Sequence, residues 1–164
     1  MKYAADGSVQ WDEMWDTFCE LAQTGGPPHR SELLMAQQGA DVTRPSYQVA
    51  ASEIARGVQL VTGLRAWQHS AGWVAMQCES AAHAHWLRDA CMAENVEART
   101  DGNFLMLPCG ENFTVAGEIK NVVTVAAKTT HYWREHLMSE VKGALIMEQL
   151  FSRIGALFRR KRFI

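Results

Sequence analysis

The sequence lacks the long apolar run that a membrane-spanning helix requires, because none of its hydrophobic stretches approaches ~18 residues. It also lacks the apolar core of a signal peptide, since its first stretch, MKYAADGSVQWDEMWD, carries acidic residues instead. We therefore expect a cytoplasmic protein. With 48% hydrophobic and 21% charged residues, the chain of 164 residues has the balance of a globular protein. Its length predicts a single domain over residues 1–164.

Cysteine is scarce, and its four copies are spread singly over the chain, at Cys19, Cys78, Cys91 and Cys109. No CxxC pair occurs, which argues against a structural zinc site. Cys78 is expected just before a helix N-terminus, where the helix dipole favours a thiolate, and Cys109 falls in a predicted loop. These two are the candidate reactive thiols, with burial as inert apolar side chains as the alternative. No GxSxG, DFG or paired-carboxylate signature accompanies them, so no catalytic residue is assigned.

The histidines are not spaced as a metal site on an α-helix would require. His83 and His85 are two residues apart on a predicted helix and therefore point to different sides. His131 and His136 are five apart, which is a poorer ligand spacing than the four residues of an HExxH motif. We assign no metal ligand, and no motif identifies a cofactor. One hypothesis nevertheless remains a thiol- or metal-dependent enzyme, or a metal-handling protein, in which a candidate thiol meets a histidine in space.

Excess positive charge is also missing, because the formal net charge is −2 at pH 7, and we expect no nucleic-acid binding. Basic residues are concentrated only at residues 159–162. They follow an amphipathic helix that apolar intervals of three and four predict over residues 140–160. We expect this helix to pack on the domain, to form a homodimer seam or to dock a protein partner. Contact with an anionic membrane surface is the less favoured alternative, because the polar face of the helix is not rich in lysine.

The stretch that organises the chain is residues 115–138, which the spacing of its apolar residues predicts to be one long helix. Its buried stripe is expected to comprise Ile119, Val122, Val123, Ala126, Thr130, Trp133 and Leu137. A helix with apolar residues on more than one side is typical of a central packing element.

The clearest supersecondary pattern lies between residues 73 and 107. A short apolar strand is predicted at 73–78 and a helix at 81–94, followed by strands at 96–100 and 103–107. The Asp101-Gly102 pair between the last two strands is a strong hairpin signal. A strand–helix–strand–strand unit is half of a ferredoxin-like sandwich.

Helices are predicted before this unit, at residues 10–23 and 46–62 and, in short form, at 32–37, while 64–71 is predicted to be a connection. The fold class that follows is α+β, with a small antiparallel or mixed sheet of three or four strands. The expected parts of the single domain are a helical N-terminal part at 1–63, the strand–helix–hairpin unit at 72–108 and two long helices at 114–162.

Two groups of polar residues are candidates for binding a small anionic ligand. His29 and Arg30 follow a Gly-Gly-Pro-Pro turn, which allows close backbone approach to a phosphate or carboxylate. The other group ends the central helix and comprises His131, Tyr132, Arg134 and His136. We hypothesise a non-catalytic ligand-binding or accessory protein that holds an anionic metabolite or cofactor between the sheet and the central helix. The alternative for the first group is a rigid corner between two helices. The alternative for the pocket is a core filled by tryptophan side chains.

Overall fold

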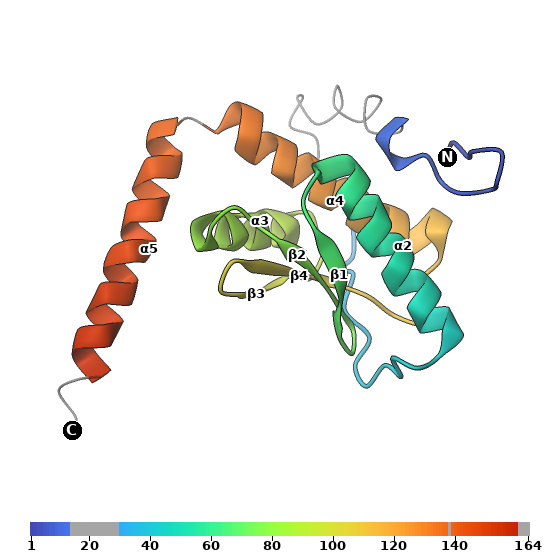
Figure 1. Ribbon diagram of the computed structural model, residues 1–164, viewed down its shortest axis with the longest axis horizontal. Helices are drawn as coiled ribbons and strands as arrows, with labels where there is room; N and C mark the ends of the chain where they lie inside the picture. The colour runs from blue at the N-terminus through green and yellow to red at the C-terminus, as the bar shows by residue number, and fades with distance from the viewer. Residues whose placement is uncertain (14–29, 138, 161–164) are drawn as a thin grey trace.

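The computed structural model describes residues 1–13, 30–137 and 139–160, with the backbone alone at 149 and 151–160. These residues form an α+β fold, in which helices pack on an antiparallel sheet with the strand order β1-β2-β4-β3 (Figure 1). The strands are β1 (Ala66–Ser70), β2 (Trp73–Gln77), β3 (Arg99–Asp101) and β4 (Phe104–Pro108). The α-helices are α2 (Pro45–Thr62), α3 (Ala81–Ala93), α4 (Lys120–His131) and α5 (Ser139–Arg160). Two π-helical turns flank α4, and these are η1 (Val115–Ile119) and η2 (Tyr132–His136).

Alternation along the strands separates the two faces of the sheet. Val74 and Met76 of β2 are fully buried in the main core, together with side chains of α2, α3 and α4. The opposite face carries a second, smaller group of apolar side chains, which we call the outer sheet face: Trp67, Trp73, Ala75, Phe104 and Met106. The helices α2, α3 and α4 therefore cover one face of the sheet, while buried Ala36, from the segment before α2, packs with the side chains of the other face.

The central helix runs without interruption from Val115 to His136 as η1, α4 and η2, and the chain is extended at Leu137. The apolar stripe that its spacing predicts is buried from Ile119 to Trp133, while Leu137 is half-buried. The helix is therefore the central packing element that the periodicity indicates. It departs from a uniform α-helix only in the π-helical turns at its two ends.

A glycine allows the close packing of α2 against the central helix. A Cβ atom on Gly57 would lie 2.7 Å from Val123 Cγ2 and 3.1 Å from Trp11 Nε1. Trp11 is buried at this crossing, and its indole N–H donates to Glu53 Oε1 at 2.8 Å. The missing side chain at position 57 thus makes room for the indole that attaches the N-terminal segment to the domain.

Two segments differ from the sequence-based expectation. Residues 32–37 are not helical, because the backbone there bonds to segments distant in sequence: Leu34 N–H donates to Asn95 O and Gln37 N–H to Cys109 O. Residues 66–70, which were expected in a connection, form the edge strand β1, paired antiparallel with β2. In both cases the hydrogen-bond partners come from elsewhere in the chain, so local propensity does not decide the conformation.

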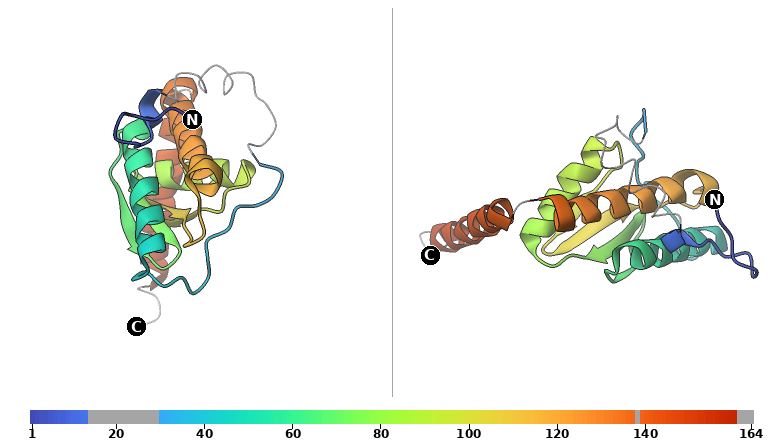
Figure 2. Two further views of the ribbon diagram at one scale, coloured as in Figure 1. Left: turned by 90° about the vertical axis from the view of Figure 1, so that its right-hand side faces the viewer. Right: turned by 90° about the horizontal axis from the view of Figure 1, so that it is seen from above.

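The helix expected at residues 10–23 is helical at residues 11–13, and the rest of that range lies outside the described residues. The C-terminal helix expected at 140–160 is α5. The start of α5 contacts α3 and the end of the central helix, where Lys142 Nζ donates to Arg134 O at 3.0 Å. Figure 2 shows that the rest of α5 extends away from the sheet.

Candidate functional site

The densest group of histidine and aromatic side chains lies where the central helix ends against the start of α3. We call this group the aromatic cluster, and its members are His83, Trp86, His131, Tyr132, Trp133 and His136. The Trp86 and Tyr132 rings stack with their centroids 5.8 Å apart and only 7° between their planes. Those of Tyr132 and His136 lie 5.6 Å apart. Three of the six, His131, Tyr132 and His136, are residues that the sequence predicts as ligand-binding.

His83 is the buried member of the cluster. Its backbone N–H donates to Ser80 Oγ at the N-cap of α3, which sets the position of the side chain in the first turn. The Glu79 backbone N–H donates to His83 Nδ1, so Nε2 is the protonated nitrogen, and it has no hydrogen-bond partner among the described residues. Burial lowers the pKa of His83 from 6.5 to about 4. This imidazole is therefore neutral and packed, and it does not face solvent.

Arg134, which the sequence predicts as an anion ligand, makes structural contacts with the protein. Its Nη1 donates to Thr62 O at 2.6 Å, at the C-terminal end of α2. Its Nε and Nη2 both lie 3.2 Å from Glu79 Oε1, in the segment before α3. The guanidinium thus joins the end of the central helix to two other elements, and most of its donors are engaged.

The two predicted groups of ligand-binding residues are not brought together. Arg30 lies near the start of the central helix, where its charge contributes, after the hydrogen bonds from Thr114, to lowering the pKa of Glu118. Glu118 and Arg134 are separated by the length of a helix of about 24 Å, so one small anion does not reach both arginines. The space between the sheet and α4 is filled by fully buried side chains such as Val122 and Leu107. His29 lies outside the described residues.

The described cysteines are buried and weakly acidic. Burial raises the pKa of Cys78 and of Cys91 to about 12, and that of Cys109 to about 11. A thiol in such surroundings is a poor nucleophile at neutral pH, because the thiolate is the reactive form. Across the described ranges, no group of three or more His, Cys, Asp and Glu side chains is placed to hold a metal ion. The two candidate thiols therefore have the surroundings of inert core cysteines.

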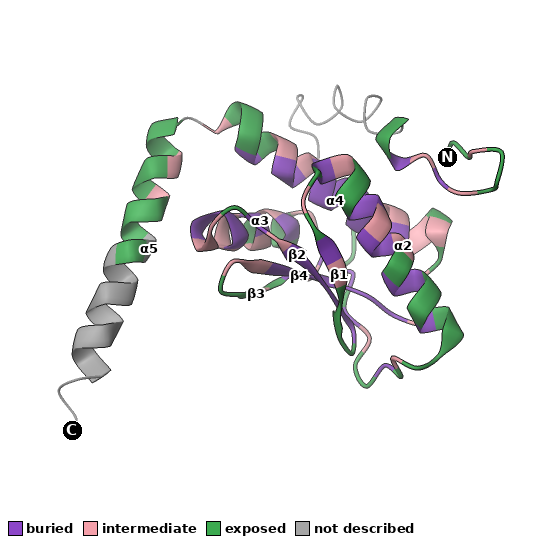
Figure 3. Ribbon diagram, in the orientation of Figure 1, coloured by how far each residue is buried: buried purple, intermediate pink, exposed green. Residues whose placement is uncertain are grey.

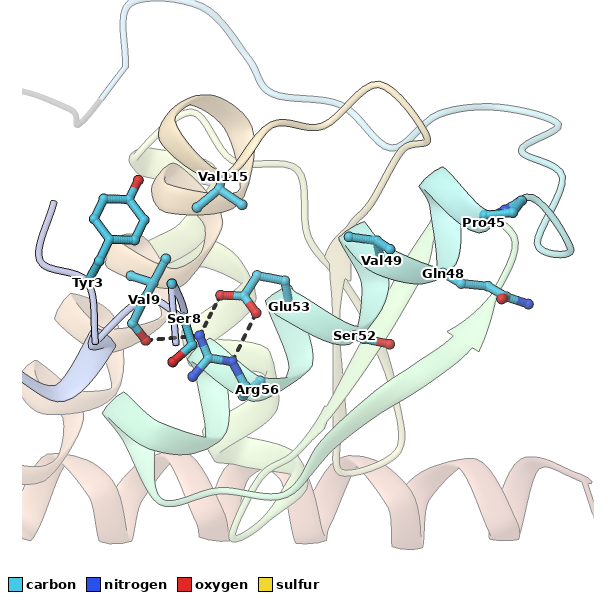
Figure 4. A pocket seen from close by; sticks show the side chains of 11 residues that line it. Tyr3, Ser8, Val9, Pro45, Gln48, Val49, Ser52, Glu53, Arg56 and Val115 are labelled. Atoms are coloured by element: carbon cyan, nitrogen blue, oxygen red, sulfur yellow. Dashed lines mark hydrogen bonds and ion pairs between the residues drawn. The ribbon is translucent and has the colours of Figure 1, made fainter. Parts of the chain in front are cut away.

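An open groove lies between the N-terminal segment, the first half of α2 and the start of the central helix (Figure 4). Its volume is about 710 Å³, and Tyr3, Val49 and Val115 supply much of its apolar lining. An ion pair between Arg56 and Glu53 forms part of the wall, and Arg56 also donates to Val9 O at 2.9 Å. Sequence reasoning missed this groove, because its walls come from three separate segments of the chain.

Most residues in the described first half of α5 are exposed (Figure 3). Ile146, Met147 and Leu150 are between 45% and 49% exposed, and Val141 is 37% exposed. None of the helices in the described part of the chain is long and apolar enough to cross a membrane. Ile146, Met147 and Leu150 lie on one side of α5.

Comparison with known protein families, with curated proteins and with solved structures finds no match for this chain.

Proposed function

We propose that this protein is a non-catalytic accessory protein that docks through α5, with a second copy of the same chain as its partner. The observation that carries the proposal is the exposed stripe of Ile146, Met147 and Leu150, which lie on one side of a helix that is attached to its domain at one end. An amphipathic helix with no domain against its apolar side buries that side in a groove or against another helix when it binds.

The distribution of charge supports a second copy as the partner. Residues 139–164 contain six basic and two acidic residues, a net charge of +4, whereas residues 1–138 contain ten basic and sixteen acidic residues, a net charge of −6. The docking helix and the body of another copy are therefore of opposite sign, which favours their encounter and the choice of partner. The buried cysteines argue against the thiol-dependent alternative, for which we make no proposal.

The test is the oligomeric state of the full chain, measured by sedimentation equilibrium over a range of concentrations. We expect a dimer for the unmodified protein and a monomer for the double variant Met147→Gln with Leu150→Gln, which removes two apolar side chains from the stripe. Glu148→Gln is the matched control, because it introduces the same side chain on the same helix without reducing the stripe, and it should remain dimeric. A monomeric unmodified protein, or a double variant that still dimerises, would contradict the proposal.

Binding of a small anionic ligand is a second candidate function. Its site would lie at the C-terminal end of the central helix instead of between the sheet and that helix. It is supported by Tyr132 and His136, which are exposed beside each other in the aromatic cluster. Titration with citrate should then raise the melting temperature in proportion to RT ln(1 + [L]/Kd). His136→Ala should abolish that shift, whereas Arg30→Ala, near the far end of the helix, should leave it unchanged. Equal loss in both variants, or no shift at all, would count against this function.

We also propose that the sheet and its helices are a cyclically permuted ferredoxin-like arrangement. The unit β2–α3–β3–β4, with β4 between the other two strands, supplies the first half of such a sandwich. The helix α2 and the strand β1, which precede that unit in the chain, supply the remaining helix and the strand beside β2. This likeness concerns topology and adds nothing to the functional argument.

A further inference from the structure

We infer that the open groove beside α2 receives the exposed stripe of α5 from a second copy of this chain. The groove has an apolar lining to which Tyr3, Val49 and Val115 contribute. An amphipathic helix that binds in such a groove inserts apolar side chains spaced three and four residues apart. The inference rests on the docking function proposed above, for which it names the receiving surface.

The two surfaces are both apolar and open to solvent. On the wall of the groove, Val49 is 66% exposed and Tyr3 is 55% exposed. On α5, Leu150 follows Met147 by three residues and Ile146 by four, which is the spacing of neighbours on one side of a helix. Contact between the stripe and the groove would therefore remove from water apolar side chains that each surface leaves exposed.

The stripe of one chain does not reach the groove of the same chain. The groove includes Val115, at the start of the central helix, whereas Lys142 holds the start of α5 at Arg134, about 28 Å further along that helix. Leu150 lies eight residues beyond Lys142, or about 12 Å along α5. Even if α5 ran back along the central helix, its stripe would cover less than half of the distance. The α5 that fills the groove thus comes from another copy.

Charge favours this arrangement over a seam between two α5 helices. Residues 139–164 have a net charge of +4, so two of these segments side by side repel each other. The pairing of Arg56 with Glu53 on the groove wall raises the pKa of the guanidinium, and the charges of nearby Asp6 and Asp12 raise it further. Three carboxylates thus act on one guanidinium, and this wall carries the negative charge that complements α5.

The positions of the two surfaces allow reciprocal docking. The N-terminal segment, which forms one wall of the groove, and α5 lie at opposite ends of the domain in Figure 1 and in the right-hand view of Figure 2. Each chain supplies one groove and one stripe. Two chains related by a two-fold axis therefore fill each other's grooves, and neither surface is left over for a third copy.

The first test places a positive charge in the groove. Val49→Lys changes an exposed apolar residue of the lining, and Leu60→Lys is the matched control, because Leu60 is exposed on the same helix outside the groove. Sedimentation equilibrium of the full chain should show a dimer dissociation constant raised by about tenfold or more in Val49→Lys, since the lysine would face an apolar and basic helix. Leu60→Lys should dimerise like the unmodified protein.

This test separates failure of the inference from failure of the docking function. If Val49→Lys dimerises as tightly as the unmodified protein, the groove is not the receiving surface, and the inference is overturned. The docking function itself is then still judged by the stripe variant Met147→Gln with Leu150→Gln. A monomeric unmodified protein would contradict both.

The second test locates the contact directly. A short bismaleimide cross-linker, added to an equimolar mixture of Val49→Cys and Met147→Cys chains, should join position 49 of one chain to position 147 of the other. Peptide mapping by mass spectrometry identifies the joined positions and so sets aside links through native cysteines. Leu60→Cys in place of Val49→Cys should give no link to position 147. Links between two copies of position 147, with none to position 49, would indicate an α5–α5 seam and overturn the inference.

Discussion

The Trp133 indole stacks on the buried His83 imidazole, with ring centroids 4.7 Å apart and only 9° between the planes. This contact joins the last turn of the central helix to the first turn of α3, immediately before the chain leaves for α5. Charging a buried imidazole costs free energy, so protonation of His83 in acid should destabilise this end of the helix.

We predict that His83 makes the protein less stable as the pH falls from about 6.5 to about 4. The pKa of His83 is about 4 in the folded protein and near 6.5 when the side chain is exposed by unfolding. The unfolded chain therefore takes up this proton first, and the free energy of unfolding decreases through that window by on the order of 3 kcal/mol. Below about pH 4 both states are protonated at His83, and its contribution no longer changes.

Urea unfolding of the unmodified protein and of His83→Phe, at several pH values between 7 and 4, measures this effect. The phenyl ring retains an aromatic partner for Trp133 and does not titrate, so its unfolding free energy should depend less on pH. Carboxylates that do not contact His83 respond alike to acid in both proteins, so their effects cancel in the comparison. Parallel pH profiles for the two proteins would show that His83 does not cause the dependence.

Gly57→Ala should destabilise the fold by about 1–3 kcal/mol, as overpacked core substitutions do. The added Cβ would come within 2.7 Å of Val123 Cγ2, a branched side chain that has no free end to move away. The matched control is Gly143→Ala in α5, where no atom lies within 4 Å and the better helix propensity of alanine should be neutral or slightly stabilising. In urea unfolding, the free energy of unfolding should fall for Gly57→Ala and stay the same or rise slightly for Gly143→Ala.

Cys78, Cys91 and Cys109 should react slowly with iodoacetamide at pH 8 in the folded protein and rapidly in urea. The reason is burial, which raises the pKa values of all three thiols and blocks access to them. Peptide mapping by mass spectrometry after timed labelling gives the rate for each residue. Rapid labelling of Cys78 or Cys109 in the folded protein would revive the thiol-dependent enzyme as a functional hypothesis.

Ser80→Ala should cost about 0.5–2 kcal/mol of stability, because it removes the side chain that caps α3. The Ser80 hydroxyl accepts from the His83 backbone N–H at 3.0 Å, so its loss leaves that donor without its partner. Ser80→Thr retains the hydroxyl and serves as the control. Thermal unfolding, monitored by circular dichroism, should give Ser80→Ala a lower melting temperature than both Ser80→Thr and the unmodified protein.

Elements with strong local signals could be predicted from the sequence. Gly63 directly follows α2 and adopts φ 68°, and Asn95, two residues beyond α3, adopts φ 59°; residues of these types commonly end helices. The hairpin between β3 and β4 was indicated by Asp101-Gly102, where the glycine also has positive φ. These features depend on conformations that few residues adopt readily, so a single residue type identifies each of them.

The amino-acid pattern alone thus establishes the main helices, the hairpin and the buried stripe of the central helix, because each depends on contacts between near neighbours. Tertiary structure alone decides that residues 34–37 are extended, that residues 66–70 form a strand, and that Arg30 and Arg134 lie far apart. It also places the rings of His131 and His136 with their centroids 5.2 Å apart, across the π-helical turn η2. Such outcomes depend on hydrogen bonds and packing between segments distant in sequence, which local periodicity does not specify.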